Sequence, residues 1–341
     1  MKKKIYVHIG FGKTGSSSLQ SYLSFNPLHE IKESQEKLLY CSFEESGKLL
    51  HGNELTEAAQ NSPLKYSSSY PGIAEFGDLG VVKAEIDKIF DQGFTPIFSQ
   101  EDWVRSAGHF ANSNFFDQLD VDVSAIVYVR PQADWFNSAW WQWFAWTGQF
   151  KMPSDVINAW GWNFMLWGSQ IASWQRLRRV NDISVRLHSS DIVDDFMRLL
   201  GATSVAGGLV PERNNVSLSP TLIKLLKKYP LLRETHSADV DSILLRFLRF
   251  EGKTPWVIES QFVNKIIDAT REDNLKLMGM LDEPSRRLME SDPRWWDVSH
   301  YETRKLWTEE DFKLTEVELY SIIEQAIPAL IKVGRESPNK Y

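Results

Sequence analysis

The stretch "KIYVHIGFGKTGSSSLQSYL", residues 4–23, decides how the chain begins to fold. Residues 4–9 include β-branched and aromatic side chains in the pattern of a buried strand, and this pattern stops at Gly10. The serines after the turn can cap a helix, and Leu19 and Leu23 share one helical face. A strand, a glycine-rich turn and a helix in this order predict the first unit of an α/β fold.

Further strands and helices alternate along the N-terminal part of the chain. Short apolar runs predict buried strands at residues 38–43, 95–100, 123–130 and 182–187. Amphipathic patterns that end at a glycine predict helices at residues 79–93 and 191–201. The alternation predicts a three-layer α/β fold with a central, mostly parallel sheet flanked by helices.

The pattern changes at about residue 215, beyond which the helical segments are those at residues 220–229, 240–250 and 318–333. We therefore expect an α/β domain over residues 1–214 and a helical C-terminal extension or cap over residues 215–341. A single larger domain is the alternative, because the polar segment 211–220 can return to the active site.

The composition narrows the class of protein. With 43% hydrophobic and 24% charged residues, the 341-residue chain has the profile of a globular protein. Its net charge of −7 argues against non-specific nucleic-acid binding, so an anion site requires a local gathering of cations and backbone N–H groups. Its one cysteine, Cys41, excludes an intrachain disulfide and a cysteine metal cluster. Because no apolar run of about 18 residues occurs, we expect a soluble, cytoplasmic protein without a membrane span.

The glycine-rich turn departs from a Walker A loop, in which a lysine directly follows the second glycine. Gly10 and Gly15 have the required spacing, but Ser16 follows Gly15 and Lys13 lies inside the loop. The strand candidates also supply no aspartate of the kind that holds Mg²⁺ in P-loop nucleotide hydrolases. A lysine within the loop suits a single 5′-phosphate whose bridging oxygen becomes the leaving group, and the alternative is a structural turn.

Two motifs resemble one enzyme family. The segment "KTGSSSLQ", residues 13–20, is similar to the 5′-phosphosulfate loop of sulfotransferases that use 3′-phosphoadenosine 5′-phosphosulfate (PAPS). The segment "IVYVRPQADWFNSAWWQ", residues 126–142, resembles the 3′-phosphate motif of that family, with Arg130 at a strand end and Ser138 eight residues later on a helix. Residues 183–201 give a weaker, supporting similarity to bacterial members.

The resemblance implies a P-loop-like fold that transfers a sulfuryl group from PAPS to an acceptor hydroxyl, without a metal, and releases adenosine 3′,5′-bisphosphate. It implies that Lys13 stabilises the leaving oxygen. The expected acceptor is a carbohydrate or glycoconjugate. The residues expected to bind the nucleotide are Gly12, Lys13, Thr14, Gly15, Ser16, Ser17, Arg130, Ser138, Arg213 and Asn215. For the last two, a polar helix cap before the helix at 220–229 is the alternative.

An acceptor hydroxyl needs a general base, and two candidates stand out. Glu101 comes just past the end of the strand at 95–100, where ligands bind in open α/β sheets. His51 follows the second strand and is the rival candidate. His8 lies within the first strand, and we expect it to be a core residue.

Nine of the 14 tryptophans lie between Trp135 and Trp174. The segment "AWWQWFAW", residues 139–146, is too crowded for all its rings to enter one core, because a helix turns about 100° per residue. A carbohydrate site, an acyl-chain site, a homodimer interface and ordinary helix packing remain open as explanations.

Two other functions compete with sulfuryl transfer. One is a small-molecule or nucleotide kinase with an altered P-loop. The other is a catalytically inactive glycan-binding protein that has kept the fold.

Overall fold

The structure is a computed structural model that describes residues 3–189, 191–204, 218–233, 238–248, 250 and 252–336. The chain forms two compact units, each assembled from three segments. The first comprises Met1–Trp135, Trp162–Asn215 and Ile266–Asp297, and the second comprises Phe136–Gly161, Val216–Lys265 and Val298–Tyr341. The chain thus changes unit next to the boundary expected at residues 214–215, and it returns to the first unit at Ile266.

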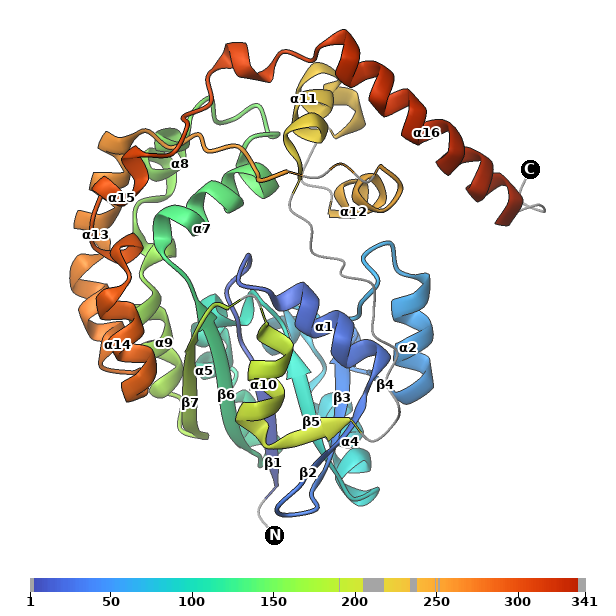
Figure 1. The fold of residues 1–341 in the computed structure, drawn as a ribbon. Helices are drawn as coiled ribbons and strands as arrows, with labels where there is room; N and C mark the ends of the chain where they lie inside the picture. The colour runs from blue at the N-terminus through green and yellow to red at the C-terminus, as the bar shows by residue number, and fades with distance from the viewer. Residues whose placement is uncertain are drawn as a thin grey trace. The chain divides into compact units, whose positions relative to one another are not determined.

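The first unit is built on one sheet with the strand order β7-β6-β1-β5-β3-β2-β8, and β4 pairs with β3 (Figure 1). The pairs among β7, β6, β1, β5 and β3 are parallel, whereas β2, β4 and β8 pair antiparallel. This confirms the mostly parallel sheet predicted from the sequence. The strands are β1 (Lys4–His8), β2 (Leu28–Ile31), β3 (Lys37–Phe43), β4 (Leu49–His51), β5 (Phe94–Ser99), β6 (Asp122–Val129), β7 (Val180–Leu187) and β8 (Ala202–Ser204).

Three helices cover one face of this sheet (Figure 1). They are α1 (Ser16–Phe25), α2 (Gly52–Asn61) and α10 (Ile192–Leu200). Leu19 and Leu23 of α1 are fully buried there, as their spacing predicted, and they pack with Tyr40, Tyr128 and Phe196. This face therefore forms a continuous apolar core between helix and sheet.

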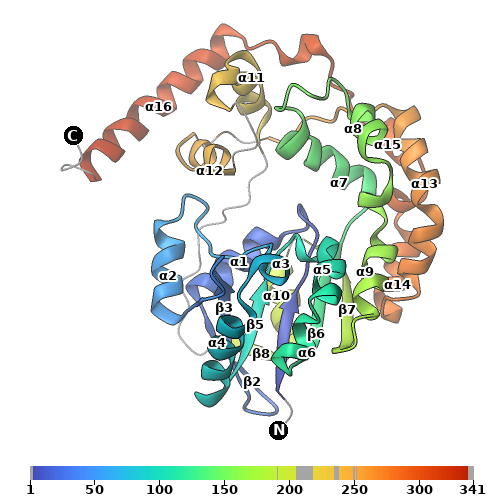
Figure 2. The same cartoon turned by 180° about the vertical axis from the view of Figure 1, so that it is seen from behind.

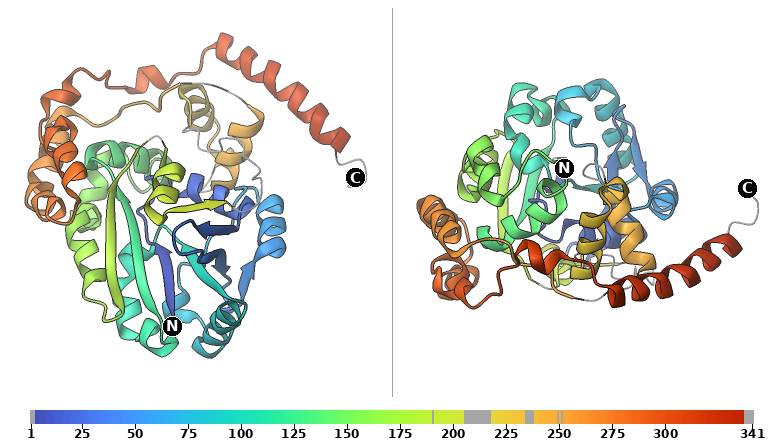
Figure 3. Two further views of the ribbon diagram at one scale, coloured as in Figure 1. Left: turned by 60° about the horizontal axis from the view of Figure 1, so that its bottom comes forward. Right: turned by 90° about the horizontal axis from the view of Figure 1, so that it is seen from above.

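Helices on the opposite face complete a three-layer α/β arrangement (Figures 2 and 3). They are α4 (Leu79–Asp91), η1 (Trp103–Ser106), α5 (Ala107–Asn112), α6 (Phe115–Leu119) and α9 (Trp167–Gln175), with α3 (Ile73–Phe76) and η3 (Asn163–Met165) nearby in the chain. An aromatic cluster fills this layer, in which Phe110 packs against Trp103, Phe116 and Trp174.

A late segment of the chain joins the first unit beside β7 and α9. The Asp273 carboxylate accepts hydrogen bonds from the backbone N–H groups of Gly168 and Ser169, at 2.7 and 2.8 Å. Asp282 pairs with Arg186 of β7 at 2.7 Å. The segment contains the end of α13 (Ser260–Met278), then α14 (Glu283–Ser291) and η5 (Pro293–Trp295).

The described elements of the second unit are helices, and the unit includes residues 136–161, which precede the change of pattern expected at about residue 215. Its elements are η2 (Trp140–Phe144), α8 (Pro153–Trp160), α11 (Pro220–Lys228), η4 (Pro230–Leu232), α12 (Ala238–Phe247), α15 (Ser299–Glu302), η6 (Glu309–Phe312) and α16 (Glu316–Glu336). The boundary between the units falls inside α7 (Gln132–Ala139) and inside α13. Within the described part of the chain, no helix has both the length and the hydropathy that crossing a bilayer requires.

The crowded tryptophan segment is accommodated by a wider helical turn. The Ala145 N–H donates to the carbonyl oxygen of Trp140 at 2.9 Å, five residues earlier, so the backbone of η2 is a π-helix. Trp140 and Trp141 are buried, whereas Trp160 of the same unit is 56% exposed. Helix packing therefore accounts for part of the cluster and leaves Trp160 at the surface.

Candidate active site

The carbonyl oxygens of the glycine-rich loop between β1 and α1 are held by side chains of the loop and of neighbouring elements. Four consecutive oxygens each accept a hydrogen bond from a side chain. The pairs are Thr14 Oγ1 to Phe11 O (2.6 Å), Trp135 Nε1 to Gly12 O (2.6 Å), Arg130 Nη1 to Lys13 O (3.0 Å) and the His188 ring to Thr14 O. Because the N–H and C=O of a trans peptide point in opposite directions, this arrangement directs the loop N–H groups inward. Such a concave array of N–H groups is an anion-binding site.

The loop backbone is left-handed at two residues. Gly15, at φ 95°, is the N-cap of α1, and a Cβ there would lie 3.1 Å from Ile192 Cδ1. The prediction that serine side chains cap this helix is wrong, because no side chain among the described residues caps α1. The first turn also lacks acidic residues, so the positive end of the helix dipole adds to the anion site. Lys13, at φ 65°, adopts a conformation that is uncommon for a non-glycine residue.

A buried histidine forms the floor of the loop. His8 Nδ1 lies 2.8 Å from Ser99 Oγ, which also accepts a hydrogen bond from the Gln20 side chain at 3.2 Å. Burial lowers the pKa of His8 to about 3, so the ring is neutral. A Cβ on Gly10 would lie 2.5 Å from His8 Nε2, which explains the glycine. His8 is therefore a core residue, as expected, although Nε2 has no hydrogen-bond partner among the described residues.

Three basic side chains gather beside the loop. Arg130 follows β6, His188 follows β7, and Arg294 comes from η5 in the late segment. Burial, then the positive charges of Arg130 and Arg294, lower the pKa of His188 to about 4, although its side chain keeps solvent-exposed surface. Arg294 is also held by Asp292 at 2.7 Å and lies 3.8 Å from Asp134. Arg130 and Arg294 therefore add positive charge next to the His188 ring, which suits an anion.

Glu101 lies directly after β5, at the edge of the sheet where β1 leads into the loop. Burial raises the pKa of Glu101 to about 7, and the neighbouring Asp102 adds to this increase. Lys13 and Arg105 act in the opposite direction. Glu101 and Lys13 are therefore close enough to interact electrostatically. A carboxylate with a pKa near 7 is suited to act as a general base at neutral pH.

His51, the other predicted base, lies beside helix α4. It ends β4, where it pairs with Cys41 of β3. It interacts electrostatically with Glu85 of α4, whose pKa is lowered mainly by Lys88 and in small part by His51. The structure thus brings Glu101 to Lys13, whereas it places His51 beside α4. The choice between the two bases stays a prediction.

The remaining predicted site residues fall into three groups. Ser16 and Ser17 follow the loop in α1, with Ser16 buried and 3.5 Å from Phe11 O. Ser138 lies on α7 in the second unit. Arg213 and Asn215 lie outside the described residues.

The sequence analysis did not identify three residues of this site, namely Trp135, His188 and Arg294. For His188 a signal existed, because it follows the end of a predicted strand as Arg130 does. Trp135 lies in the tryptophan-rich region, for which a carbohydrate site is one explanation. Its indole N–H instead donates a hydrogen bond to the loop, at the Gly12 carbonyl oxygen. Nothing in the local sequence around Arg294 indicates that it lies near the loop.

The chain matches no family model, and it matches none of the curated proteins. Among solved structures, it is similar to a sulfotransferase from Alicyclobacillus acidocaldarius, with 14% identity and a TM-score of 0.38. The alignment covers 72% of this chain and 96% of the other. The functional proposal below therefore rests on the backbone and side chains of the site.

Proposed function

We propose that this protein is a PAPS-dependent sulfotransferase that acts on an acceptor hydroxyl. The observation that carries the proposal is the loop, whose carbonyl oxygens are held by side chains and whose lysine lies within it. A second basic cluster lies beside it, after β6 and β7. Two adjacent anion sites fit a nucleotide with phosphate groups on both its 5′ and 3′ oxygens.

The loop residues have a defined role in this proposal. PAPS supplies the sulfuryl group, whose sulfur bonds to the acceptor oxygen as its bond to the 5′-phosphate oxygen breaks. The inward N–H groups of the loop bind the 5′-phosphate, and the Lys13 ammonium stabilises the charge that develops on the leaving oxygen. One such donor contributes about 10²- to 10³-fold in turnover.

The basic cluster would hold the 3′-phosphate. Arg130 and Arg294 offer guanidinium groups, which match the oxygens of a phosphate monoester. The 3′-phosphate dianion would raise the pKa of His188. The protonated imidazole ring would then donate a hydrogen bond to this phosphate, beside the two guanidinium groups.

Glu101 would remove the proton of the acceptor hydroxyl. Its raised pKa, about 7, makes it a stronger base than an ordinary carboxylate. Its proximity to Lys13 places proton removal next to the loop that holds the leaving group.

Thermal stabilisation by three nucleotides tests the proposal. Adenosine 3′,5′-bisphosphate without Mg²⁺ should raise the melting temperature more than adenosine 5′-phosphate or Mg·ATP does. A clear preference for Mg·ATP would instead support a kinase. Binding of the bisphosphate, with no turnover of labelled PAPS on any acceptor, would support an inactive binding protein.

An Arg130→Gln variant tests the 3′-phosphate assignment. Glutamine removes the charge and keeps a donor for the Lys13 carbonyl oxygen, so the loop should stay intact. We expect about 10- to 100-fold weaker binding of the bisphosphate and unchanged binding of adenosine 5′-phosphate, measured by calorimetry. Equal losses for both nucleotides would refute the assignment.

A further inference from the structure

A cavity of about 420 Å³ opens beside the carboxyl ends of β3 and β5, within the first unit. It is lined by residues 42–45 at the end of β3, by Leu50, by Ser62, Leu64 and residues 66–71, and by Gln100. We propose that this cavity binds the acceptor, and that the acceptor is a small hydroxylated compound that carries an ammonium group. This inference rests on the proposed function, because it names the acceptor class of the same site.

The wall of the cavity is held by hydrogen bonds to its backbone. The bonds run from Tyr40 Oη to Ser67 O (2.7 Å), from Ser67 N to Ser24 Oγ (3.0 Å), from Ser69 N to Ser99 O (3.1 Å) and from Tyr70 N to Phe43 O (2.8 Å). These bonds use backbone groups of the segment, so the side chains of Tyr66, Ser68 and Tyr70 remain to line the cavity. The cavity is therefore preformed, and its volume lies in the range of small-molecule sites.

Gln100 connects the cavity to the proposed reaction centre. Its backbone N–H donates to the His8 carbonyl oxygen at 3.0 Å, at the point where β1 ends and the loop begins. Its side-chain amide donates to the Ser69 carbonyl oxygen in the cavity wall. The next residue in the chain is Glu101, so Gln100 links the cavity wall to the residue that would remove the acceptor proton.

The charges around the cavity select the acceptor class. Glu44 and Glu45 are exposed at its lining, and the Tyr70 hydroxyl donates to Glu45 at 3.4 Å. None of the described residues that line the cavity is Lys, Arg or His. Two carboxylates without a lining cation disfavour an anionic acceptor and favour an ammonium group. The rings of Tyr66 and Tyr70 offer apolar faces for the C–H groups of a sugar-like ring.

The test compares three acceptors of similar size and different charge, namely glucosamine, N-acetylglucosamine and glucuronic acid, at saturating PAPS. We expect kcat/KM to be highest for glucosamine, with roughly a tenfold gap to glucuronic acid. A Glu44→Gln/Glu45→Gln variant should lose most of this gap, because its kcat/KM with glucosamine should fall toward the value with glucuronic acid. The matched control is Glu57→Gln, an exposed residue of α2 outside the cavity lining, which should keep the gap. A rate with glucuronic acid that equals the rate with glucosamine would overturn the acceptor class.

A Ser68→Trp variant tests the location. The indole would fill the cavity, so turnover of all three acceptors should fall at least tenfold while binding of adenosine 3′,5′-bisphosphate stays unchanged. Unchanged turnover would overturn the cavity as the acceptor site.

A failure of the proposed sulfuryl transfer can be distinguished from a failure of the proposed acceptor cavity. If the wild-type protein neither binds the bisphosphate nor turns over PAPS with any acceptor, sulfuryl transfer is refuted, and with it the acceptor role. Binding of glucosamine measured by NMR, and its loss in Ser68→Trp, would then still support the cavity as an amine site. Absence of that binding would overturn the cavity as an amine site as well.

Discussion

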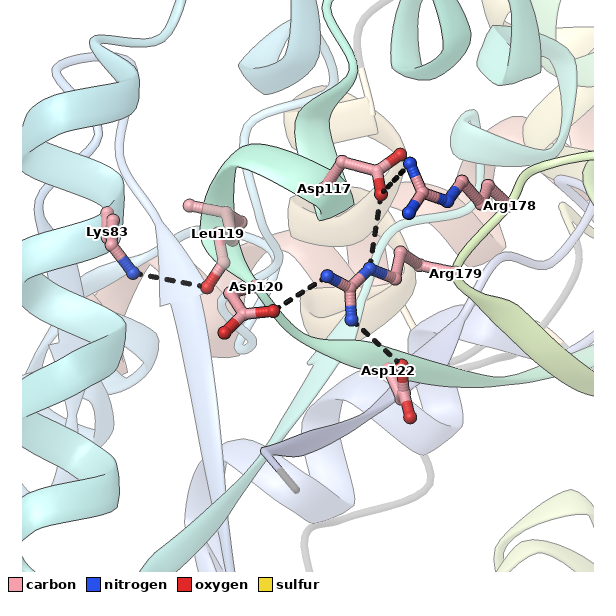
Figure 4. A network of polar contacts seen from close by, with 7 residues as sticks. All are labelled: Lys83, Asp117, Leu119, Asp120, Asp122, Arg178 and Arg179. Atoms are coloured by element: carbon pink, nitrogen blue, oxygen red, sulfur yellow. Dashed lines mark hydrogen bonds and ion pairs between the residues drawn. The ribbon is translucent and has the colours of Figure 1, made fainter. Parts of the chain in front are cut away.

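Two clusters of charged side chains lie at opposite ends of the same two strands, and they are built in opposite ways. At the amino ends of β6 and β7, Arg179 contacts three carboxylates, at 3.1 Å from Asp117, 2.7 Å from Asp120 and 3.4 Å from Asp122 (Figure 4). These carboxylates raise the pKa of Arg179. Opposite charges are paired there, and nearby Lys83 donates to the Leu119 carbonyl oxygen at 3.3 Å.

At the carboxyl ends of the same strands, like charges are gathered. Arg130 follows β6 and His188 follows β7, and Arg294 joins them. Burial lowers the pKa of His188, and the two arginines lower it further, whereas the carboxylates raise the pKa of Arg179. Pairing opposite charges stabilises a fold, whereas gathering like charges works against it. Perturbed charges that are gathered at one edge are typical of a functional site, so this contrast favours the carboxyl edge as the place of the proposed anion site.

The largest expected effect comes from Glu101→Gln. Glutamine cannot accept the proton, so turnover should fall about 10²- to 10⁴-fold. In the wild-type protein, kcat/KM should rise with pH through about 7, because the base must be deprotonated, and this limb should vanish in the variant. A pH profile at saturating PAPS measures the fall in turnover and the loss of the rise of kcat/KM with pH. If the variant keeps that rise, Glu101 is not the base.

The same substitution also changes stability with pH. The folded protein holds the Glu101 proton more tightly than the unfolded chain, because the folded pKa is about 7 against an ordinary value of 4.5. The stability of the wild type relative to Glu101→Gln should therefore be highest below pH 4.5 and should decline as the pH rises through 7. Thermal unfolding of both proteins between pH 4 and 8 measures the decline, and a flat difference would contradict the raised pKa.

A comparison of Lys13→Ala with Lys83→Ala tests the contrast between the two edges directly. Lys13→Ala should lower turnover about 10²- to 10³-fold with little loss of bisphosphate affinity, because its charge acts on the leaving oxygen. Alanine at this left-handed position has the same backbone strain as lysine, so folding should persist. Lys83→Ala should leave turnover unchanged. Steady-state kinetics and calorimetry separate these outcomes, and a loss of affinity alone for Lys13→Ala would reject the leaving-group role.

A smaller effect is expected from Arg294→Ala. Binding of adenosine 3′,5′-bisphosphate should weaken about 3- to 10-fold, because Arg294 is partly exposed and shared with Asp292. Removing this positive charge should also raise the pKa of His188, which NMR titration of the ring can follow. The control is Arg287→Ala, an exposed residue of α14 that pairs with Glu283. The same weakening in the control would point to a general effect of charge.

The smallest effect on activity is expected at the amino edge. Arg179→Ala leaves Asp117, Asp120 and Asp122 without their shared cation, so the melting temperature should fall while kcat and KM stay unchanged. Thermal unfolding and kinetics on the same sample test this. A fall in kcat at an unchanged melting temperature would contradict the assignment of Arg179 to stability alone.

Much of the first unit could be predicted because its signals are local. The strand at residues 123–130 and the helix at 79–93 correspond to β6 and α4, with ends that differ by one or two residues. The capping of α1 could not be predicted in this way. Serines at a helix start can serve as caps, but the left-handed turn at Gly15 made the glycine the N-cap.

Local signals in the sequence are enough to predict the βα unit, the glycine-rich loop with Lys13 inside it, and the positions of Arg130 and Glu101 at strand ends. These follow from hydrophobic periodicity and turn chemistry, which act over a few residues. The tertiary structure alone decided that Trp135, His188 and Arg294 meet at the loop, and that residues 66–71 form a cavity wall beside β3 and β5. Such contacts depend on the strand order and on the return of a late segment to β7, which no local pattern encodes.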